Sequence, residues 1–68
     1  MIKLTTELRT DDVIVIEDNA WLEVWTDPVP TDEHGRWTFM AMDVATHKVE
    51  QHAAQPHFDW EVRDDPTV

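Results

Sequence analysis

Short runs of β-branched and aromatic residues alternate along this chain with clusters of polar residues, and this pattern predicts short β-strands. Residues 13–18 (VIVIED) form a compact β-branched run, and residues 20–27 (AWLEVWTD) follow it. The pair Asp18-Asn19 suits a tight turn because Asn tolerates a positive φ angle. We therefore expect the two runs to form a β-hairpin.

Three more strands are expected after this hairpin. Residues 27–36 hold two prolines and the only glycine of the chain, so they are predicted to form a loop. Residues 45–47 and 55–57 are the next expected turns. The strands between them are residues 36–44 (RWTFMAMDV), 48–54 (KVEQHAA) and 58–62 (FDWEV).

The start and the middle of the chain are less clearly patterned. Residues 3–7 (KLTTE) are expected to form a short strand, and residues 8–12 (LRTDD) the turn that follows it. Residues 40–55 contain good helix formers, so a helix competes weakly with strands there. The β-branched Val44 and Val49 favour strands, which would also let consecutive elements pair with each other.

The strand pattern predicts an all-β fold, namely a small antiparallel five-stranded, partly open barrel of SH3-like type. Closure of the sheet is expected because it protects strand edges that a flat sheet leaves exposed. A chain of 68 residues has room for one core, so we expect a single domain over residues 1–68. Its ordered core is predicted over residues 3–63, with a frayed tail over residues 64–68.

The alternation within each strand predicts which side chains form the core. In residues 58–62 the apolar side chains all share one face, and in residues 20–27 Leu22 and Val24 form an apolar pair without an intervening charge on their face. The residues expected to point inward are Leu22, Val24, Trp37, Phe39, Phe58, Trp60 and Val62.

If Leu22 and Val24 point inward, the alternate side chains of the same strand point outward. Two exposed indoles on one strand form an apolar patch of the kind that marks an interface. In a second interpretation, the two indoles cover Met40 and Met42 or the N-terminal segment as a minor cluster. The residues predicted to bind a partner are Trp21, Glu23 and Trp25.

So short a chain needs some additional source of stability besides an ordinary core. Disulfides are excluded because the chain has no Cys, which also fits a reducing cytoplasmic location. Four Trp and two Phe make dense aromatic packing one route, and self-association, as a homodimer, is another. The N-terminus has no apolar segment typical of a signal peptide, and no apolar run is long enough to cross a bilayer.

Charge excludes two classes of partner. Five Lys and Arg against 15 Asp and Glu give a net charge of −10, with no basic run that could neutralise phosphates. We therefore expect no direct binding of nucleic acid or of an anionic membrane. The carboxylates either keep the surface soluble or serve a basic, nucleic-acid-binding protein partner.

Catalytic and metal-binding chemistry has little support. The chain has neither Ser nor Cys, and its adjacent acid pairs fall in predicted turns, where carboxylates are solvated. His47, His52 and His57 recur at five-residue intervals, which reverse the face of a strand and match no zinc signature. We expect no metal site, no cofactor and no enzymatic activity.

Three stretches carry a family resemblance: residues 5–24 (TTELRTDDVIVIEDNAWLEV), residues 35–52 (GRWTFMAMDVATHKVEQH) and residues 58–64 (FDWEVRD). In this order they resemble the short, mostly uncharacterised SH3-like barrel proteins of actinobacteria and their phages. The resemblance spans residues 5–63 and implies a barrel fold and the strand order, but no specific function. This chain departs from it by lacking a turn glycine at Asp11, at Asn19-Ala20 and at His47.

Two functional hypotheses follow from these features. The first is a small acidic protein-interaction module, with phage origin as one source, that binds a protein partner or itself through the face with Trp21, Glu23 and Trp25. The second is an acidic nucleic-acid mimic, whose spaced carboxylates imitate phosphates and occupy a host nucleic-acid-binding protein.

Overall fold

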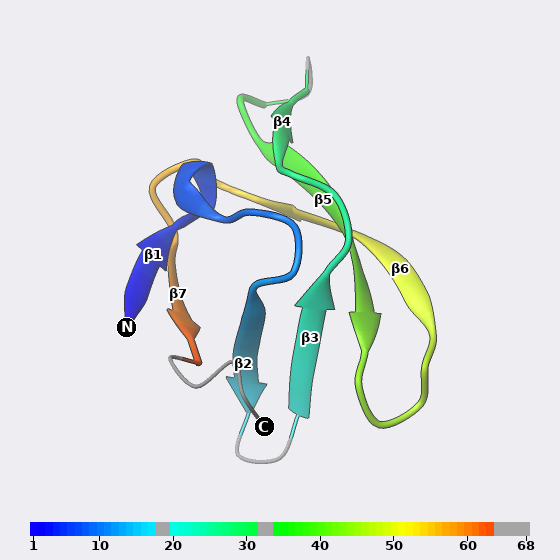
Figure 1. Ribbon diagram of the computed structural model, residues 1–68. Helices are drawn as coiled ribbons and strands as arrows, with labels where there is room; N and C mark the ends of the chain where they lie inside the picture. Colours follow the sequence, from blue (N-terminus) through cyan, green and yellow to red (C-terminus); the bar gives the residue numbers. More distant parts are fainter. Residues whose placement is uncertain (18–19, 32–33, 64–68) are drawn as a thin grey trace.

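A computed structural model describes residues 1–17, 20–31 and 34–63. Within them the chain forms seven β-strands and one short 3-10 helix, and no α-helix (Figure 1). The elements are β1 (Ile2–Leu4), η1 (Thr5–Glu7), β2 (Val13–Glu17), β3 (Ala20–Val24), β4 (Val29–Pro30), β5 (Trp37–Asp43), β6 (Val49–Ala54) and β7 (Asp59–Val62).

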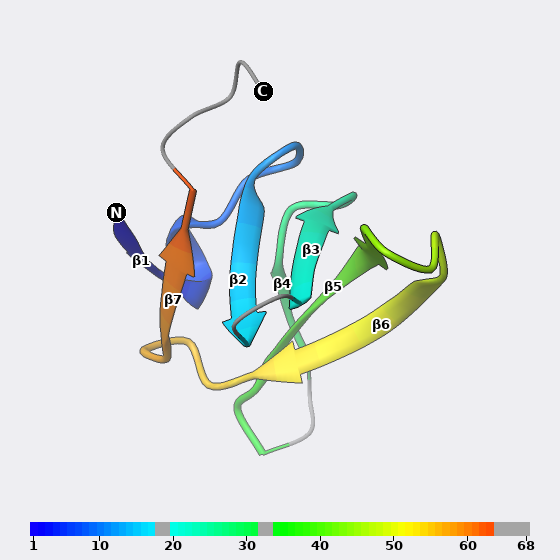
Figure 2. The same ribbon diagram turned by 90° about the horizontal axis from the view of Figure 1, so that it is seen from below.

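All seven strands belong to one antiparallel sheet. Six of them follow one another in the order β1-β7-β2-β3-β5-β4, and β6 pairs with β5. β5 is the longest strand and has three neighbours, because β3 and β4 share one of its edges and β6 pairs along the other. The sheet curls into a half-barrel whose inner face holds the core (Figures 1 and 2). The predicted all-β antiparallel fold is thus confirmed, and the predicted strand count of five is wrong.

The strands β1 and β4 make up the difference from the predicted count of five. β1 is the short strand expected over residues 3–7, but it covers residues 2–4, where it pairs with β7. Pairing of Val29 with Thr38 adds β4 inside the loop predicted over residues 27–36. Residues 3–7 are not one strand, since the backbone turns into η1 after Leu4, whose N–H donates to Glu7 Oε1 at 2.8 Å.

The other predicted strands are present with boundaries shifted by up to three residues. β2 and β3 pair with each other, with a β-bulge between Val15 and Glu17. Residues 40–55 contain the end of β5, a turn and β6, so the competing helix does not form. The turn predicted at residues 18–19 and the tail predicted at residues 64–68 lie outside the described residues.

Four of the seven predicted core residues are buried, and three are not. Trp60 is partly buried and packs against the core, Trp37 is half-buried, and Phe58 is 52% exposed. The prediction for Phe58 was wrong because this residue directly precedes β7 and lines an open pocket, where its ring packs edge-to-face on Trp60. The buried core consists of Leu8, Ile14, Leu22, Val24, Phe39, Ala41 and Val62.

Three turns of the described chain place a non-glycine residue in the left-handed backbone region, at Asp11, His34 and His47, and two of these residues, Asp11 and His47, bear on the sequence resemblance. Asp11 has a φ angle of 80° and His47 one of 63°. In the turn after β5, the Asp43 side chain accepts hydrogen bonds from the backbone N–H groups of Ala45 and Thr46, and His47 N donates to Asp43 O. At both positions the SH3-like barrel proteins that the sequence resembles have glycine, which adopts this conformation most easily.

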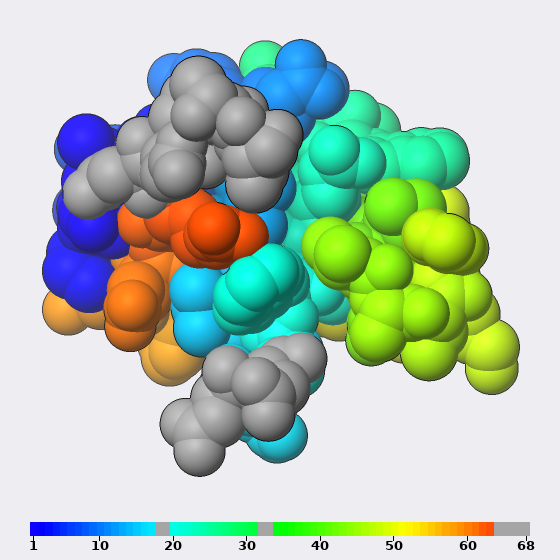
Figure 3. Space-filling model, turned by 60° about the horizontal axis from the view of Figure 1, so that its bottom comes forward, coloured from blue at the N-terminus to red at the C-terminus, as the bar shows by residue number. Residues whose placement is uncertain are grey.

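The turn between β5 and β6 projects from one side of the molecule, as the space-filling view shows (Figure 3). The described part of the chain contains no helix of the length and apolar character needed to cross a bilayer.

Candidate functional site on the outer face of the sheet

The side chains of β3 alternate as predicted. Leu22 and Val24 are buried in the core, whereas Trp21 and Glu23 are half-buried on the outer face. Trp25 directly follows β3 and extends its ladder, because its backbone N–H donates to Met40 O at 2.8 Å. Trp25 is 48% exposed, which makes it the most accessible of the three residues predicted to bind a partner.

The exposed indole of Trp25 is held in place by its neighbour on the same face. Trp25 Nε1 donates a hydrogen bond to Glu23 Oε1 at 3.1 Å. An aromatic side chain that is already fixed in one orientation loses less conformational entropy on binding than a mobile one. Glu23 therefore orients the ring of Trp25 and leaves much of its surface accessible.

Trp21 is partly covered, in contrast to Trp25. The guanidinium carbon of Arg63 lies 4.2 Å from the centroid of the Trp21 ring, which is cation–π geometry. This contact exists because β7 pairs with β2, and Arg63 N continues that ladder by donating to Val13 O. Sequence reasoning missed it, since the pairing of two strands distant in sequence brings the two side chains together.

The apolar surface around Trp25 continues across β5. Met40 and Met42 point to the same outer face and are half-buried. Met40 lies next to Trp25 in the ladder, and Met42 lies directly opposite both Glu23 and Val49. Trp25 thus adjoins Met40 in the ladder and yet remains accessible.

A second apolar site lies at the opening of the half-barrel. The rings of Phe39, Trp60 and Phe58 form a chain of edge-to-face contacts, with centroids 5.8 Å and 4.8 Å apart. Trp60 Nε1 donates to the buried Thr5 hydroxyl at 2.9 Å, which fixes this ring. Sequence reasoning missed this site because it expected Phe58 and Trp60 to be enclosed.

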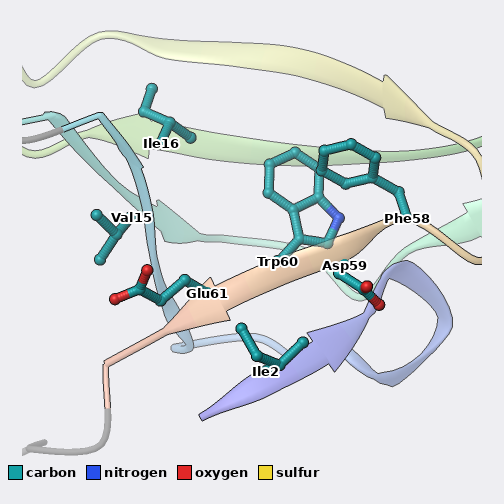
Figure 4. A pocket seen from close by; sticks show the side chains of 7 residues that line it. All are labelled: Ile2, Val15, Ile16, Phe58, Asp59, Trp60 and Glu61. Atoms are coloured by element: carbon teal, nitrogen blue, oxygen red, sulfur yellow. The ribbon is translucent and has the colours of Figure 1, made fainter.

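This opening forms a shallow pocket of about 440 Å³. Figure 4 shows Phe58 and Trp60 side by side on one side of β7, with Ile16 of β2 directed to the same side. The residues that line it are Ile2, Val15, Ile16, Phe58, Asp59, Trp60 and Glu61.

The histidines are dispersed over different elements. His47 lies in the turn after β5, His57 lies in the turn before β7, and His52 stacks on Phe39 with ring centroids 5.7 Å apart. Over residues 1–17, 20–31 and 34–63, no group of three or more His, Asp and Glu side chains could hold a metal ion.

Several carboxylates have structural partners. Asp12 Oδ2 accepts hydrogen bonds from Lys3 Nζ at 3.0 Å and from the Arg9 backbone N–H at 2.9 Å. Asp27 Oδ1 accepts from the Thr10 backbone N–H at 2.7 Å and from its hydroxyl at 3.0 Å. These two hydrogen bonds lower the pKa of Asp27 below its ordinary value of 3.8, because they stabilise the charged form. Both carboxylates organise the loop before β2.

The outer face thus offers one accessible, oriented indole beside two thioethers, and we name Trp21, Glu23 and Trp25 the outer stripe. Such a surface can bind another protein, since aromatic and methionine side chains are enriched at protein interfaces. In comparisons with known proteins, no family model, no curated protein and no solved structure matches the chain.

Proposed function

We propose that this chain is a small acidic protein-interaction module that binds a protein partner through the outer stripe. The observation that carries the proposal is the half-exposed indole of Trp25, held by Glu23 and adjoining Met40 on an apolar surface. Tryptophan is the residue type most often found at the energetic centre of protein interfaces. Trp25 is therefore the anchor of the interaction, and Trp21 and Glu23 support it.

The charge of the chain defines the chemistry of the partner. Glu23 lies within the stripe, and the exposed Glu61 faces outward from β7, within a chain of net charge −10. A partner with an apolar pocket for Trp25 and basic residues around it would complement this surface. The same charge disfavours direct contact with nucleic acid or with an anionic membrane.

The proposal includes an SH3-like identity for the half-barrel and kinship with the short barrel proteins of actinobacteria and their phages. It is supported by the predicted order of β2, β3, β5, β6 and β7 and by the left-handed backbone of Asp11 and His47, at positions where those proteins have glycine. We place the module in the cytoplasm, where a chain without Cys is stable without disulfides.

The test compares proteins retained from a cell extract by the immobilised wild-type chain and by two variants. Trp25→Ala removes the anchor, and Phe58→Ala removes an aromatic ring of similar exposure from the opening of the half-barrel. We expect at least one protein to be retained by the wild type and by Phe58→Ala but lost with Trp25→Ala. For a purified partner, the loss in affinity should be roughly 30-fold or more, as for other central tryptophans.

Two results would contradict the proposal. The first is the same set of retained proteins for the wild type and for the Trp25→Ala variant. The second is that the wild type retains no protein beyond those retained by an unrelated acidic domain.

The second candidate function is an acidic mimic of nucleic acid. It is favoured by the exposed carboxylates of Glu7, Asp11, Glu17, Glu50 and Asp59, which lie on several different elements. A partner bound through them should be a nucleic-acid-binding protein that dissociates as salt rises from about 0.1 M to about 1 M. Binding through the outer stripe should change little over the same range.

A further inference from the structure

β6 pairs on one side only. Its six residues pair with β5 from Val49↔Met42 to Ala54↔Trp37, and no other described strand pairs with it. Figure 2 shows β6 along the outside of the sheet, and Figure 1 shows no strand beyond it. The outer edge of β6 is therefore available to another chain.

The ladder determines which backbone groups point outward. Asp43 N donates to Lys48 O at 2.8 Å, so these two opposite residues form a hydrogen-bonded pair. Hydrogen-bonded pairs alternate in an antiparallel ladder, which makes Glu50 and His52 the next residues bonded to β5. The N–H and C=O groups that point away from β5 belong to Val49, Gln51 and Ala53.

This edge has few of the usual features that prevent strand addition. β6 contains no Pro and no Lys, and its pairing with β5 runs without a bulge. The side chains beside the outward backbone groups, those of Val49, Gln51 and Ala53, are exposed and uncharged. Glu50 is the one charged residue within the strand.

We propose that the edge of β6 binds the β6 edge of a second copy of this chain, antiparallel and with the two-fold axis at Gln51. In this register Gln51 lies opposite Gln51, and Val49 lies opposite Ala53, so all the outward backbone groups are used. Three hydrogen-bonded residue pairs of this kind exchange about six main-chain hydrogen bonds.

This register is supported by the pairing of a carboxylate with an imidazole. It places Glu50 of each copy directly opposite His52 of the other, in a non-hydrogen-bonded pair where side chains lie closest. A carboxylate can accept a hydrogen bond from an imidazole there, and the contact occurs twice by symmetry. An axis at Glu50 would instead place two carboxylates against each other, and an axis at His52 would leave the two glutamates without a histidine opposite.

The self-association goes beyond the proposed function and uses a different surface. A two-fold axis perpendicular to the sheet keeps the outer faces of both copies on the same side. The dimer would thus have one continuous sheet carrying two outer stripes. Each stripe would remain accessible to a protein partner, so the dimer would bind that partner bivalently.

The first test is the solution mass of the full chain by size-exclusion chromatography with light scattering. We expect a solution mass of twice the chain mass for the wild type and for Trp25→Ala, which changes a different surface. We expect the same mass for Gln51→Ala, because this variant keeps the backbone N–H of residue 51. Gln51→Pro removes an outward N–H without affecting the ladder to β5, so it should be a monomer. A monomeric wild type, or a Trp25→Ala variant that is monomeric while folded, would overturn the proposal.

The second test does not depend on the folding of the proline variant. Because the chain has no Cys, Gln51→Cys introduces a single thiol that would face its symmetry mate at a Cα separation of about 5.5 Å, within disulfide range. Oxidised glutathione should convert it to a covalent dimer. Ala53→Cys should not cross-link alone but should do so when mixed with Val49→Cys. Equal cross-linking by all three single variants would contradict the register.

Discussion

At the scale of single residues, Trp21 in β3 and Trp25 directly after β3 share a face of the sheet but differ in how accessible their rings are. Arg63 stacks on Trp21, whereas Trp25 has a hydrogen bond to Glu23 and an accessible ring. Strand alternation predicts that both point outward, since it depends on local geometry alone. It could not predict the cover on Trp21, because that contact depends on the pairing of β7 with β2.

The backbone of His47 gives a prediction about stability. A side chain at a φ angle of 63° is strained relative to glycine, so His47→Gly should raise the free energy of unfolding by about 0.5–1 kcal/mol. Urea denaturation followed by tryptophan fluorescence measures it. Ala45→Gly in the same turn, where φ is not positive, is the matched control and should lower stability. A loss of stability in both variants would contradict the explanation.

Asp27 gives a prediction about pH. Its pKa is lower in the folded chain than in the unfolded chain, so its hydrogen bonds to Thr10 contribute stability that is fully present above the ordinary value of 3.8. This contribution is lost as the pH falls through the lower folded-state pKa. Asp27→Asn should therefore melt below the wild type at neutral pH, and the difference should shrink below about pH 4. A difference in melting temperature that stays constant down to about pH 3 would refute it.

At the scale of elements, the alternation of apolar and polar residues predicts where the strands lie. It does not predict which of the inward-facing side chains are covered by the rest of the fold. Leu22 and Val24 lie where the half-barrel is closed, and Phe58 lies where it is open, although all three occupy inward positions by alternation. Leu8 is buried despite its position in a polar segment, because the chain after η1 passes over the core. A two-residue strand such as β4 leaves too short a pattern to detect.

The same contrast predicts how core and opening respond to truncation. Ile14 is fully buried and lies opposite both Leu22 and Val62, so Ile14→Ala should lower the free energy of unfolding by about 2–5 kcal/mol. Phe58→Ala removes a half-exposed ring and should cost much less, about 1 kcal/mol. Equal losses in a urea titration would show that Phe58 belongs to the core after all.

At the scale of the whole molecule, the half-barrel has a small core and two surfaces suited to protein contacts. Among the residues that the structure describes, seven buried apolar residues form that core, which is a small core for a domain of this size. Closure into a barrel was expected to protect the strand edges, yet β6 keeps one edge open. Pairing at this edge would supply the stabilisation that the sequence led us to expect from self-association, and the outer stripe would then be available for a partner.

The central claim is that Trp25 anchors a protein partner. Its most direct test uses a partner that the wild-type chain retains from a cell extract and that is then purified. The affinity of this partner is measured by titration for the wild-type chain and for the Trp25→Ala and Phe58→Ala variants. We predict wild-type affinity for Phe58→Ala and a loss of roughly 30-fold or more for Trp25→Ala, with both variants folded. Unchanged affinity in Trp25→Ala would contradict the claim and direct attention to the carboxylates.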